Sequence, residues 1–191
     1  MHATTRTPNS PGELGEIAGS VVLHECDVTA LDAGNLLAAS IGDTALDVII
    51  YNAGVNPKPE EGKSESSVMN TNAIAPFLVI TPLLKNLQGQ KKLALVSSQL
   101  GSREAFGKGS IPKPIYHASK CVLNDGFREQ EPAWRERYGL TSVIFHPGWV
   151  SGLKSVDPSM YNSDFSPSVC AVPTQPPGGH RYGGRECRHR C

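Results

Sequence analysis

The feature that most constrains the fold is an alternation of short apolar segments with longer helical ones. Four segments rich in aliphatic and β-branched residues have the length of buried strands, at 21–24, 46–51, 93–96 and 141–145. Stretches with helical character lie at 11–18, 30–41, 64–87 and 114–138. Strands that alternate with helices are typical of an α/β domain built on a parallel sheet. The sequence therefore predicts such a domain over residues 1–150.

Length and composition narrow the class of protein. At 191 residues the chain is long enough for one domain with a sizeable core. Its 18 basic and 18 acidic residues balance, which indicates neither nucleic acid nor a membrane surface as a partner. The longest apolar run, 73–84, is shorter than the roughly 20 residues that span a bilayer. The N-terminus has no apolar core like that of a signal peptide, and Cys26 and Cys121 stand singly. We therefore expect a soluble, cytoplasmic protein.

Small, polar or turn-forming residues follow every predicted strand. In chain order they are Asp27-Val28, Asn52-Ala53-Gly54, Ser97-Ser98 and Pro147-Gly148. In open parallel sheets, ligands bind just beyond the carboxyl ends of the strands. The sequence therefore predicts a binding site at this end of the sheet, and the site includes the serine pair.

Tyr116 and Lys120 are the strongest catalytic candidates. Their four-residue spacing places both side chains on one face of the predicted helix 114–138. A neighbouring ammonium favours the ionised form of a phenol and lowers its pKa toward neutrality. A phenol tuned in this way gives a proton to a carbonyl oxygen or takes one from an alcohol. The same spacing also occurs on solvated helix faces, so the hypothesis depends on the surrounding motifs.

Six motifs occur in a fixed order along residues 2–150. They are Asp27-Val-Thr, Asn52-Ala-Gly, Asn72-Ala-Ile-Ala-Pro-Phe, Ser97-Ser-Gln-Leu-Gly, Tyr116-His-Ala-Ser-Lys and His146-Pro-Gly-Trp-Val. Together they resemble the short-chain dehydrogenase/reductases, which are nicotinamide-dependent oxidoreductases on a Rossmann-type, doubly wound parallel sheet. The residues of the last two motifs are similar to those found in the branch of C-factor-like proteins and norsolorinic acid ketoreductases.

The resemblance implies catalytic roles for four residues. Tyr116 would be the general acid in reduction of a ketone or aldehyde, and the base in oxidation of an alcohol. Lys120 would lower the pKa of Tyr116 and bind the nicotinamide ribose. Ser98 would hold the substrate oxygen, and Asn72 would fix a water that relays protons.

The resemblance also implies a set of cofactor contacts. Arg6, at the end of the family's second strand, would pair with the 2′-phosphate of NADP, with NAD as the alternative cofactor. The other residues implied are Asp27, Val28, Asn52, Ala53, Gly54, Tyr116, Lys120, Pro147, Gly148 and Val150. No metal is expected, because His180, Cys187, His189 and Cys191 match no standard zinc spacing.

The chain departs from the family pattern at both ends. No strand with a Gly-x-x-x-Gly-x-Gly turn precedes Asp27, and that strand is normally central in the sheet. Its absence would leave the second and fourth strands with unpaired edges, or force them to close up. After Val150, residues 151–191 are rich in Cys, Pro, Arg and Gly, and the last strand is not recognisable. We expect a truncated chain with an incomplete Rossmann domain over 1–150 and a divergent, disordered tail over 151–191.

Two functions remain open at this point. The first is an NADP-dependent reductase of a small carbonyl compound, or the reverse alcohol dehydrogenase. The second is an inactive remnant that keeps the site residues and acts through protein interaction. The family resemblance implies a homodimer or homotetramer in which helices 64–87 and 114–138 form the interface.

Overall fold

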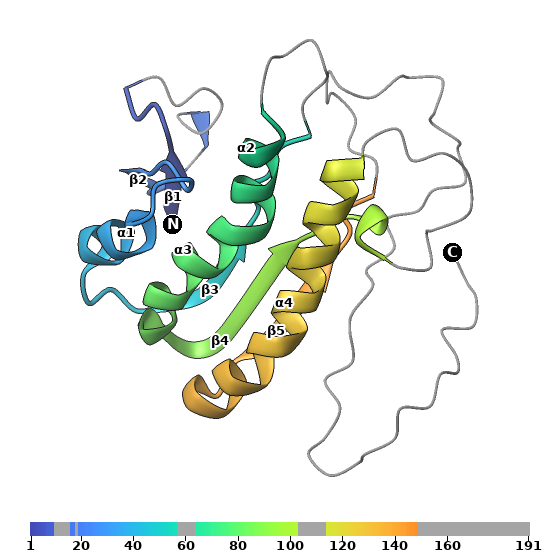
Figure 1. Cartoon of the computed structure of the whole chain (residues 1–191). Helices are drawn as coiled ribbons and strands as arrows, with labels where there is room; N and C mark the ends of the chain where they lie inside the picture. Colours follow the sequence, from blue (N-terminus) through green and yellow to red (C-terminus); the bar gives the residue numbers. More distant parts are fainter. Residues whose placement is uncertain (10–15, 18, 57–63, 103–113, 149–191) are drawn as a thin grey trace.

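The computed structural model describes residues 1–9, 16–17, 19–56, 64–102 and 114–148 (Figure 1). It confirms the α/β class, because helices alternate with strands that all pair in parallel. The strands are β1 (His2–Thr5), β2 (Val22–Glu25), β3 (Leu46–Tyr51), β4 (Leu87–Val96) and β5 (Thr141–Phe145). The predicted tail, 151–191, lies outside the described residues.

Three of the four predicted helices are present. The first is α1 (Ala33–Ile41), and the last is α4 (Pro114–Tyr138). The predicted helix 64–87 is a continuous run of four short elements, and Ser64 caps the first of them. They are α2 (Glu65–Met69), the π-helical turn η3 (Asn70–Ile74), α3 (Ala75–Leu83) and the 3-10 turn η4 (Leu84–Asn86). The predicted helix 11–18 lies largely outside the described residues.

Strand β4 begins six residues earlier than the sequence predicts. Leu87 already pairs with Leu46, and the register then shifts before Val48 pairs with Lys92. The polar segment between these two pairings contains Gly89 at φ +61° and so accommodates an irregular strand. Sequence alternation misses this part because its polar residues show no strand periodicity.

The strands form two separate sheets. Strands β1 and β2 pair with each other, and the second sheet has the order β3-β4-β5. Within the described residues no ladder joins β1 to β3, so each of these strands has an unpaired edge. A sheet that lacks its central strand was expected either to have unpaired edges or to close up, and here the edges are unpaired.

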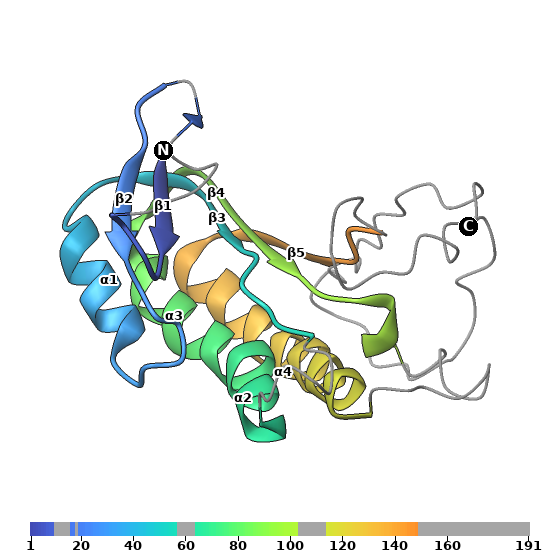
Figure 2. The ribbon, with the colours of Figure 1, turned by 90° about the horizontal axis from the view of Figure 1, so that it is seen from above.

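A shared layer of helices and one hydrophobic core hold the two sheets together. Helices α3 and α4 lie side by side on one face of β3-β4-β5, and α1 lies beside β1 and β2 (Figure 2). A single cluster of buried residues includes Leu37 of α1, Ile80 of α3, Leu93 and Leu95 of β4, and Leu123 of α4. Burying each such side chain stabilises the fold by roughly 1.5–3 kcal/mol. The core therefore spans the break in the sheet.

Polar contacts add to the packing at the N-terminal sheet. His2 Nδ1 and His24 Nε2 share a hydrogen bond of 2.8 Å, which joins β1 to β2 through their side chains. The other ring nitrogen of His24, Nδ1, lies 2.7 Å from Ser40 Oγ on α1. His24 is buried, so both ring nitrogens need partners. The chain of three side chains fixes α1 to this sheet.

One helical run has the length and apolar character of a membrane span. It covers Glu65–Asn86, which is 22 residues, and 56% of its most apolar window is buried inside the protein. Val79, Ile80 and Leu83 from this run belong to the core cluster. We therefore assign it as a core helix of the domain.

Helices α1 and α3 approach each other closely at Gly34. A Cβ atom added there would lie 2.9 Å from Val79 Cα and would collide with the Leu78 carbonyl oxygen. We expect Gly34→Ala to lower the free energy of unfolding by about 1–3 kcal/mol, because the two helices must separate. Chemical denaturation measures this change. Asn35→Ala, at the exposed neighbouring position, is the control and should stay within about 0.5 kcal/mol of the parent chain.

Candidate active site

The carboxyl end of β4 positions the serine pair. The Ser97 N–H donates to the Phe145 carbonyl oxygen at 2.8 Å, which continues the β4-β5 ladder by one residue. Ser98 then caps the 3-10 turn η5 (Gln99–Gly101), because its Oγ accepts from the Leu100 N–H at 3.2 Å. The Ser98 side chain is thereby fixed just beyond the strand end.

Tyr116 and Lys120 lie on the first turns of α4, as the spacing predicts. The Lys120 Nζ atom is 6.0 Å from the centre of the Tyr116 ring. The lysine is only 4% exposed, and its Nζ donates to the Val96 carbonyl oxygen at 3.2 Å. The helix therefore places an ammonium group beside the phenol and against the end of β4.

Burial controls the ionisation of both groups. It lowers the pKa of Lys120 from 10.5 to about 8. It also raises the pKa of Tyr116, while a hydrogen bond with Ser98 acts in the opposite direction. The net direction therefore differs from the expectation, because the pKa of Tyr116 is raised overall and not lowered. Removal of the phenol from water outweighs the other contributions, and Ser98 is the group that opposes it.

Asn72 lies in the π-helical turn η3 and is completely buried. Its Nδ2 donates to the Val55 carbonyl oxygen at 2.8 Å and to Ser119 Oγ at 3.0 Å, and its Oδ1 accepts from the Val55 N–H at 2.8 Å. Pro76, four residues later, has no N–H to donate to the Asn72 carbonyl, which favours the wider turn here. The side chain of Asn72 thus ties the loop after β3 to α4.

Ser119 is a site residue that the sequence analysis did not single out. Its hydroxyl donates to the Tyr116 carbonyl oxygen at 2.7 Å and accepts from Asn72. It connects two of the predicted catalytic residues. The sequence feature that could have pointed to Ser119 is its place inside the Tyr116-His-Ala-Ser-Lys motif.

Gly54 brings the loop after β3 against the side chains of Asn72 and Lys120. A Cβ atom added at Gly54 would lie 3.4 Å from Asn72 Oδ1 and 3.5 Å from Lys120 Nζ. The glycine therefore leaves space directly beside the lysine amine. The preceding residues, Asn52 and Ala53, are exposed and half-buried at the same strand end.

Arg6 and Asp27 form a second group at the ends of β1 and β2. Hydrogen bonds from the Thr29 hydroxyl and N–H hold the pKa of Asp27 below its usual value, and the charge of Arg6 lowers it further. Val28, which follows Asp27, packs against the core. Asn70 Nδ2 donates to the Thr29 carbonyl oxygen at 3.3 Å and so links this group to η3.

The remaining predicted residues follow β5. Pro147 and Gly148 are half-buried, and Gly148 adopts φ +78°. Val150 lies outside the described residues. The structure therefore places Ser98, Tyr116, Lys120, Asn72 and Gly54 together at the ends of β3 and β4. Arg6 and Asp27 occupy the corresponding end of the other sheet.

Comparisons with known proteins define the class further. No family model matches the chain, and no curated protein matches it. Several solved structures match the chain. A carbonyl reductase from Pseudomonas aeruginosa in complex with NADP is 27% identical with a TM-score of 0.65, over 81% of this chain and 70% of that one. An NADPH-bound carbonyl reductase from chicken fatty liver is 27% identical with a TM-score of 0.66, over 78% and 68%. A protein predicted to be a short-chain alcohol dehydrogenase, from Burkholderia multivorans, is 25% identical with a TM-score of 0.67, over 78% and 72%.

The parallel strands, the helix layer and the tyrosine–lysine helix define an α/β protein of the Rossmann type. The solved structures that resemble this chain are short-chain dehydrogenases and carbonyl reductases. This similarity and the six ordered motifs support the resemblance to the short-chain dehydrogenase/reductases.

The burial of Lys120 predicts a pH-dependent stability. A folded-state pKa of about 8 against 10.5 means that burial disfavours the charged lysine by on the order of 3 kcal/mol below pH 8. This penalty decreases between pH 8 and 10.5. In that range the lysine is already neutral in the folded state but still charged in the unfolded state. We expect Lys120→Met to be more stable than the parent at pH 7 and to lose that advantage by pH 10. Denaturation at both pH values measures it.

Lys92→Met is the matched control for this prediction, because Lys92 is an exposed lysine on β4. Substitution at this exposed position should change the free energy of unfolding by no more than about 0.5 kcal/mol at pH 7. A Lys120→Met protein that is less stable than the parent at pH 7, by an amount that does not change with pH, would show that the buried amine carries no penalty.

Proposed function

We propose that this chain is an NADP-dependent oxidoreductase that reduces a ketone or aldehyde to an alcohol, or catalyses the reverse oxidation. The observation that carries the proposal is the hydrogen bond between Ser98 and Tyr116 beside the buried amine of Lys120. A phenol, a hydroxyl and an ammonium group at one strand end are suited to bind a carbonyl oxygen and protonate it.

In the proposed reaction Tyr116 is the proton donor. The Ser98 hydroxyl donates to the substrate oxygen and holds it in reach of the Tyr116 phenol. As charge develops on that oxygen, the phenol transfers its proton to it, and the positive charge of Lys120 favours the resulting phenolate. Because burial raises the pKa of Tyr116, the phenol is fully protonated at neutral pH before reduction begins.

The residues present fit the nicotinamide half of the cofactor. Gly54 leaves space beside the Lys120 amine, which is suited to bind a ribose hydroxyl. Pro147 and Gly148 lie at the end of the neighbouring strand. When bound, NADPH supplies the hydride, and the protein supplies orientation and charge. Val150 remains a proposed contact on the basis of the resemblance.

Asn72 is proposed to supply the end of a proton relay. Its two amide hydrogens already bind Val55 and Ser119, so its side chain is committed to the protein. Its backbone carbonyl receives no α-helical hydrogen bond from Pro76. We therefore propose the carbonyl, rather than the amide, as the atom that holds a water beyond Lys120.

Arg6 and Asp27 are proposed to bind the adenosine half. Arg6 is exposed at the end of β1, and its guanidinium is suited to pair with a 2′-phosphate. Asp27, Val28, Asn52 and Ala53 would surround the adenine and its ribose. This arrangement favours NADP over NAD.

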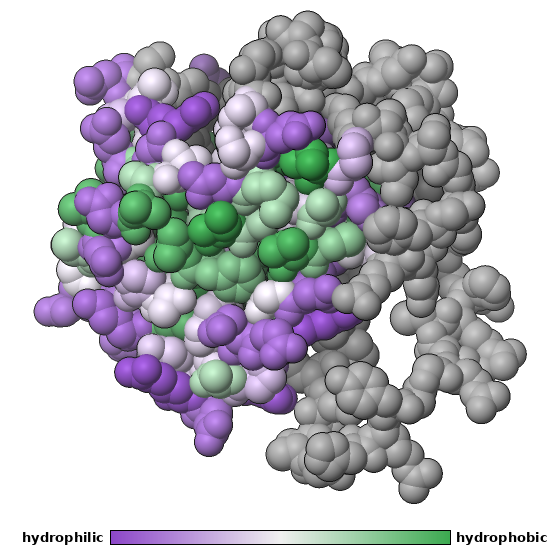
Figure 3. All heavy atoms as spheres, viewed as in Figure 1, coloured by the Kyte–Doolittle hydropathy of each residue, from purple (hydrophilic) through white to green (hydrophobic). Residues whose placement is uncertain are grey.

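The helix face opposite the sheet is proposed as a dimer interface. Ile74, Leu78 and Val122 are large apolar residues exposed on the helices, at 50%, 38% and 46%. Figure 3 shows an apolar area across the middle of this face. A homodimer or homotetramer would cover this area.

The resemblance to norsolorinic acid ketoreductases suggests an aromatic ketone as the substrate.

The split sheet favours one alternative function. The described residues provide no glycine-rich turn for the cofactor's pyrophosphate, and β1 does not pair with β3. A chain with this arrangement could retain the catalytic residues yet act only through protein interaction. Cofactor binding distinguishes the two functions.

We expect NADPH to raise the melting temperature of the chain at micromolar concentration. We also expect Tyr116→Phe to bind NADPH as the parent does and to lose reductase activity by about 10²–10⁴-fold, because the proton donor is gone. Thermal-shift titration and NADPH oxidation with a panel of aromatic ketones and aldehydes measure the two effects. No binding at millimolar NADPH would favour the interaction function, and unchanged activity in Tyr116→Phe would contradict the role of the phenol.

Arg6→Ala should weaken NADPH binding by about 10–100-fold, because a hydrogen-bonded charge pair with the 2′-phosphate is lost. NADH, which has no such phosphate, is the matched control ligand and should bind both proteins equally. Calorimetric titration measures both affinities. An equal loss for the two ligands would show that Arg6 does not select the phosphate.

A further inference from the structure

The turn η5 packs directly on α4 beside the catalytic lysine. A Cβ atom added at Gly101 would lie 2.8 Å from the Lys120 carbonyl oxygen and 2.7 Å from Asn124 Nδ2. Both contacts are too short for a side chain, so a glycine is required for this approach. The Cys121 thiol lies 3.9 Å from the Leu100 carbonyl oxygen on the same face of the helix.

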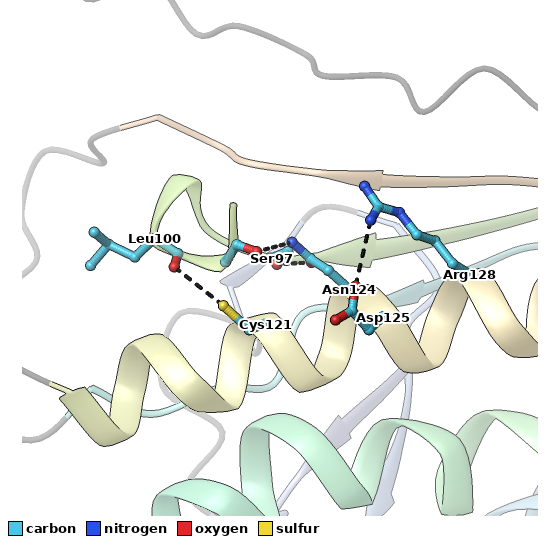
Figure 4. A network of polar contacts seen from close by, with 7 residues as sticks. Ser97, Leu100, Cys121, Asn124, Asp125 and Arg128 are labelled. Carbon is cyan, nitrogen blue, oxygen red and sulfur yellow. Dashed lines mark hydrogen bonds and ion pairs between the residues drawn. The ribbon is translucent and has the colours of Figure 1, made fainter. Parts of the chain in front are cut away.

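Asn124 connects the two ends of this turn, as Figure 4 shows. Ser97 Oγ donates to Asn124 Oδ1 at 2.6 Å, and Asn124 Nδ2 donates to the Gly101 carbonyl oxygen at 2.9 Å. One side chain of α4 therefore binds the residue before Ser98 and the residue three positions after it.

Ser98 is fixed between these two contacts. Its carbonyl oxygen accepts from the Gly101 N–H at 2.9 Å, and its Oγ accepts from the Leu100 N–H at 3.2 Å. Tyr116 lies on the same helix as Asn124, two turns earlier. The distance from the Ser98 hydroxyl to the phenol is thus set by how Asn124 attaches the turn to the helix.

We propose that Asn124 is a positioning residue, which acts through Ser97 and Gly101 to hold the Ser98 hydroxyl in hydrogen-bond reach of Tyr116. Its catalytic consequence rests on the proposed function, whereas the Ser98–Tyr116 geometry exists without cofactor. Asn124 itself does not need to touch the substrate.

The test reads the ionisation of Tyr116 directly. A ring-fluorinated tyrosine placed at position 116 has a more acidic phenol, so it titrates while the other tyrosines stay protonated. Because the Ser98 hydrogen bond lowers the pKa of Tyr116, its loss should raise that pKa. We expect Asn124→Ala to raise it in the same direction as Ser98→Ala, and the double variant to show no further shift. Phenolate absorbance measures the titration.

Asp125→Asn is the matched control, since the Asp125 side chain is 45% exposed at the next position of the helix. It should leave the titration unchanged. Ser97→Ala removes only one of the two contacts of Asn124, and it should shift the pKa upward by less than Asn124→Ala. It also serves as the test variant if Asn124→Ala does not fold.

Three results would overturn the positioning role. They are an unchanged titration in folded Asn124→Ala, a downward shift caused by entry of water, and a shift that persists when Ser98 is already alanine. If the parent chain reduces carbonyl compounds, Asn124→Ala should also lower kcat by about tenfold with NADPH affinity unchanged. An inactive parent chain would contradict the proposed function, while the titration would still decide the role of Asn124.

Discussion

The hydrogen bonds of Asn72 are the constraint on which the site depends. Asn72 binds both backbone groups of Val55 and the hydroxyl of Ser119, and Ser119 in turn binds the Tyr116 carbonyl. These contacts join the loop after β3, the turn η3 and helix α4. Each partner is buried or half-buried, so loss of one would leave polar groups unpaired at about 1–3 kcal/mol each. The relative positions of Gly54, Lys120 and Tyr116 follow from this connection.

The same region contains a buried lysine whose charged form lowers the stability of the fold. Lys120 is almost completely buried, and its hydrogen bond to the Val96 carbonyl only partly replaces the water it has lost. A methionine would pack there with less penalty. A destabilising buried lysine at this position is consistent with the proposal that its amine takes part in binding or catalysis, because functional sites often reduce the stability of their fold. The proposed contact with a ribose hydroxyl gives the amine such a role.

Sequence patterns predicted the features that depend on local periodicity. They placed β3 and β5 at their observed bounds, and they put Tyr116 and Lys120 on one helix. The early start of β4 was missed because its polar residues carry no alternation. Ser119 and Asn124 were missed because their roles depend on partners distant in the chain. The direction of the Tyr116 pKa was wrong for a related reason, since burial is a property of the packed molecule and not of a four-residue spacing.

The break between the two sheets divides the site into two parts. The group around Tyr116 lies on β3-β4-β5 and α4, whereas Arg6 and Asp27 lie on β1 and β2. The contacts that join the parts include the packing of α1 on α3 at Gly34 and the hydrogen bond from Asn70 to Thr29. Within the described ranges, no strand ladder joins the two parts or fixes their relative position. A dinucleotide that contacts both parts would therefore act as a structural link between the sheets, and part of its binding free energy would be used to fix their relative orientation.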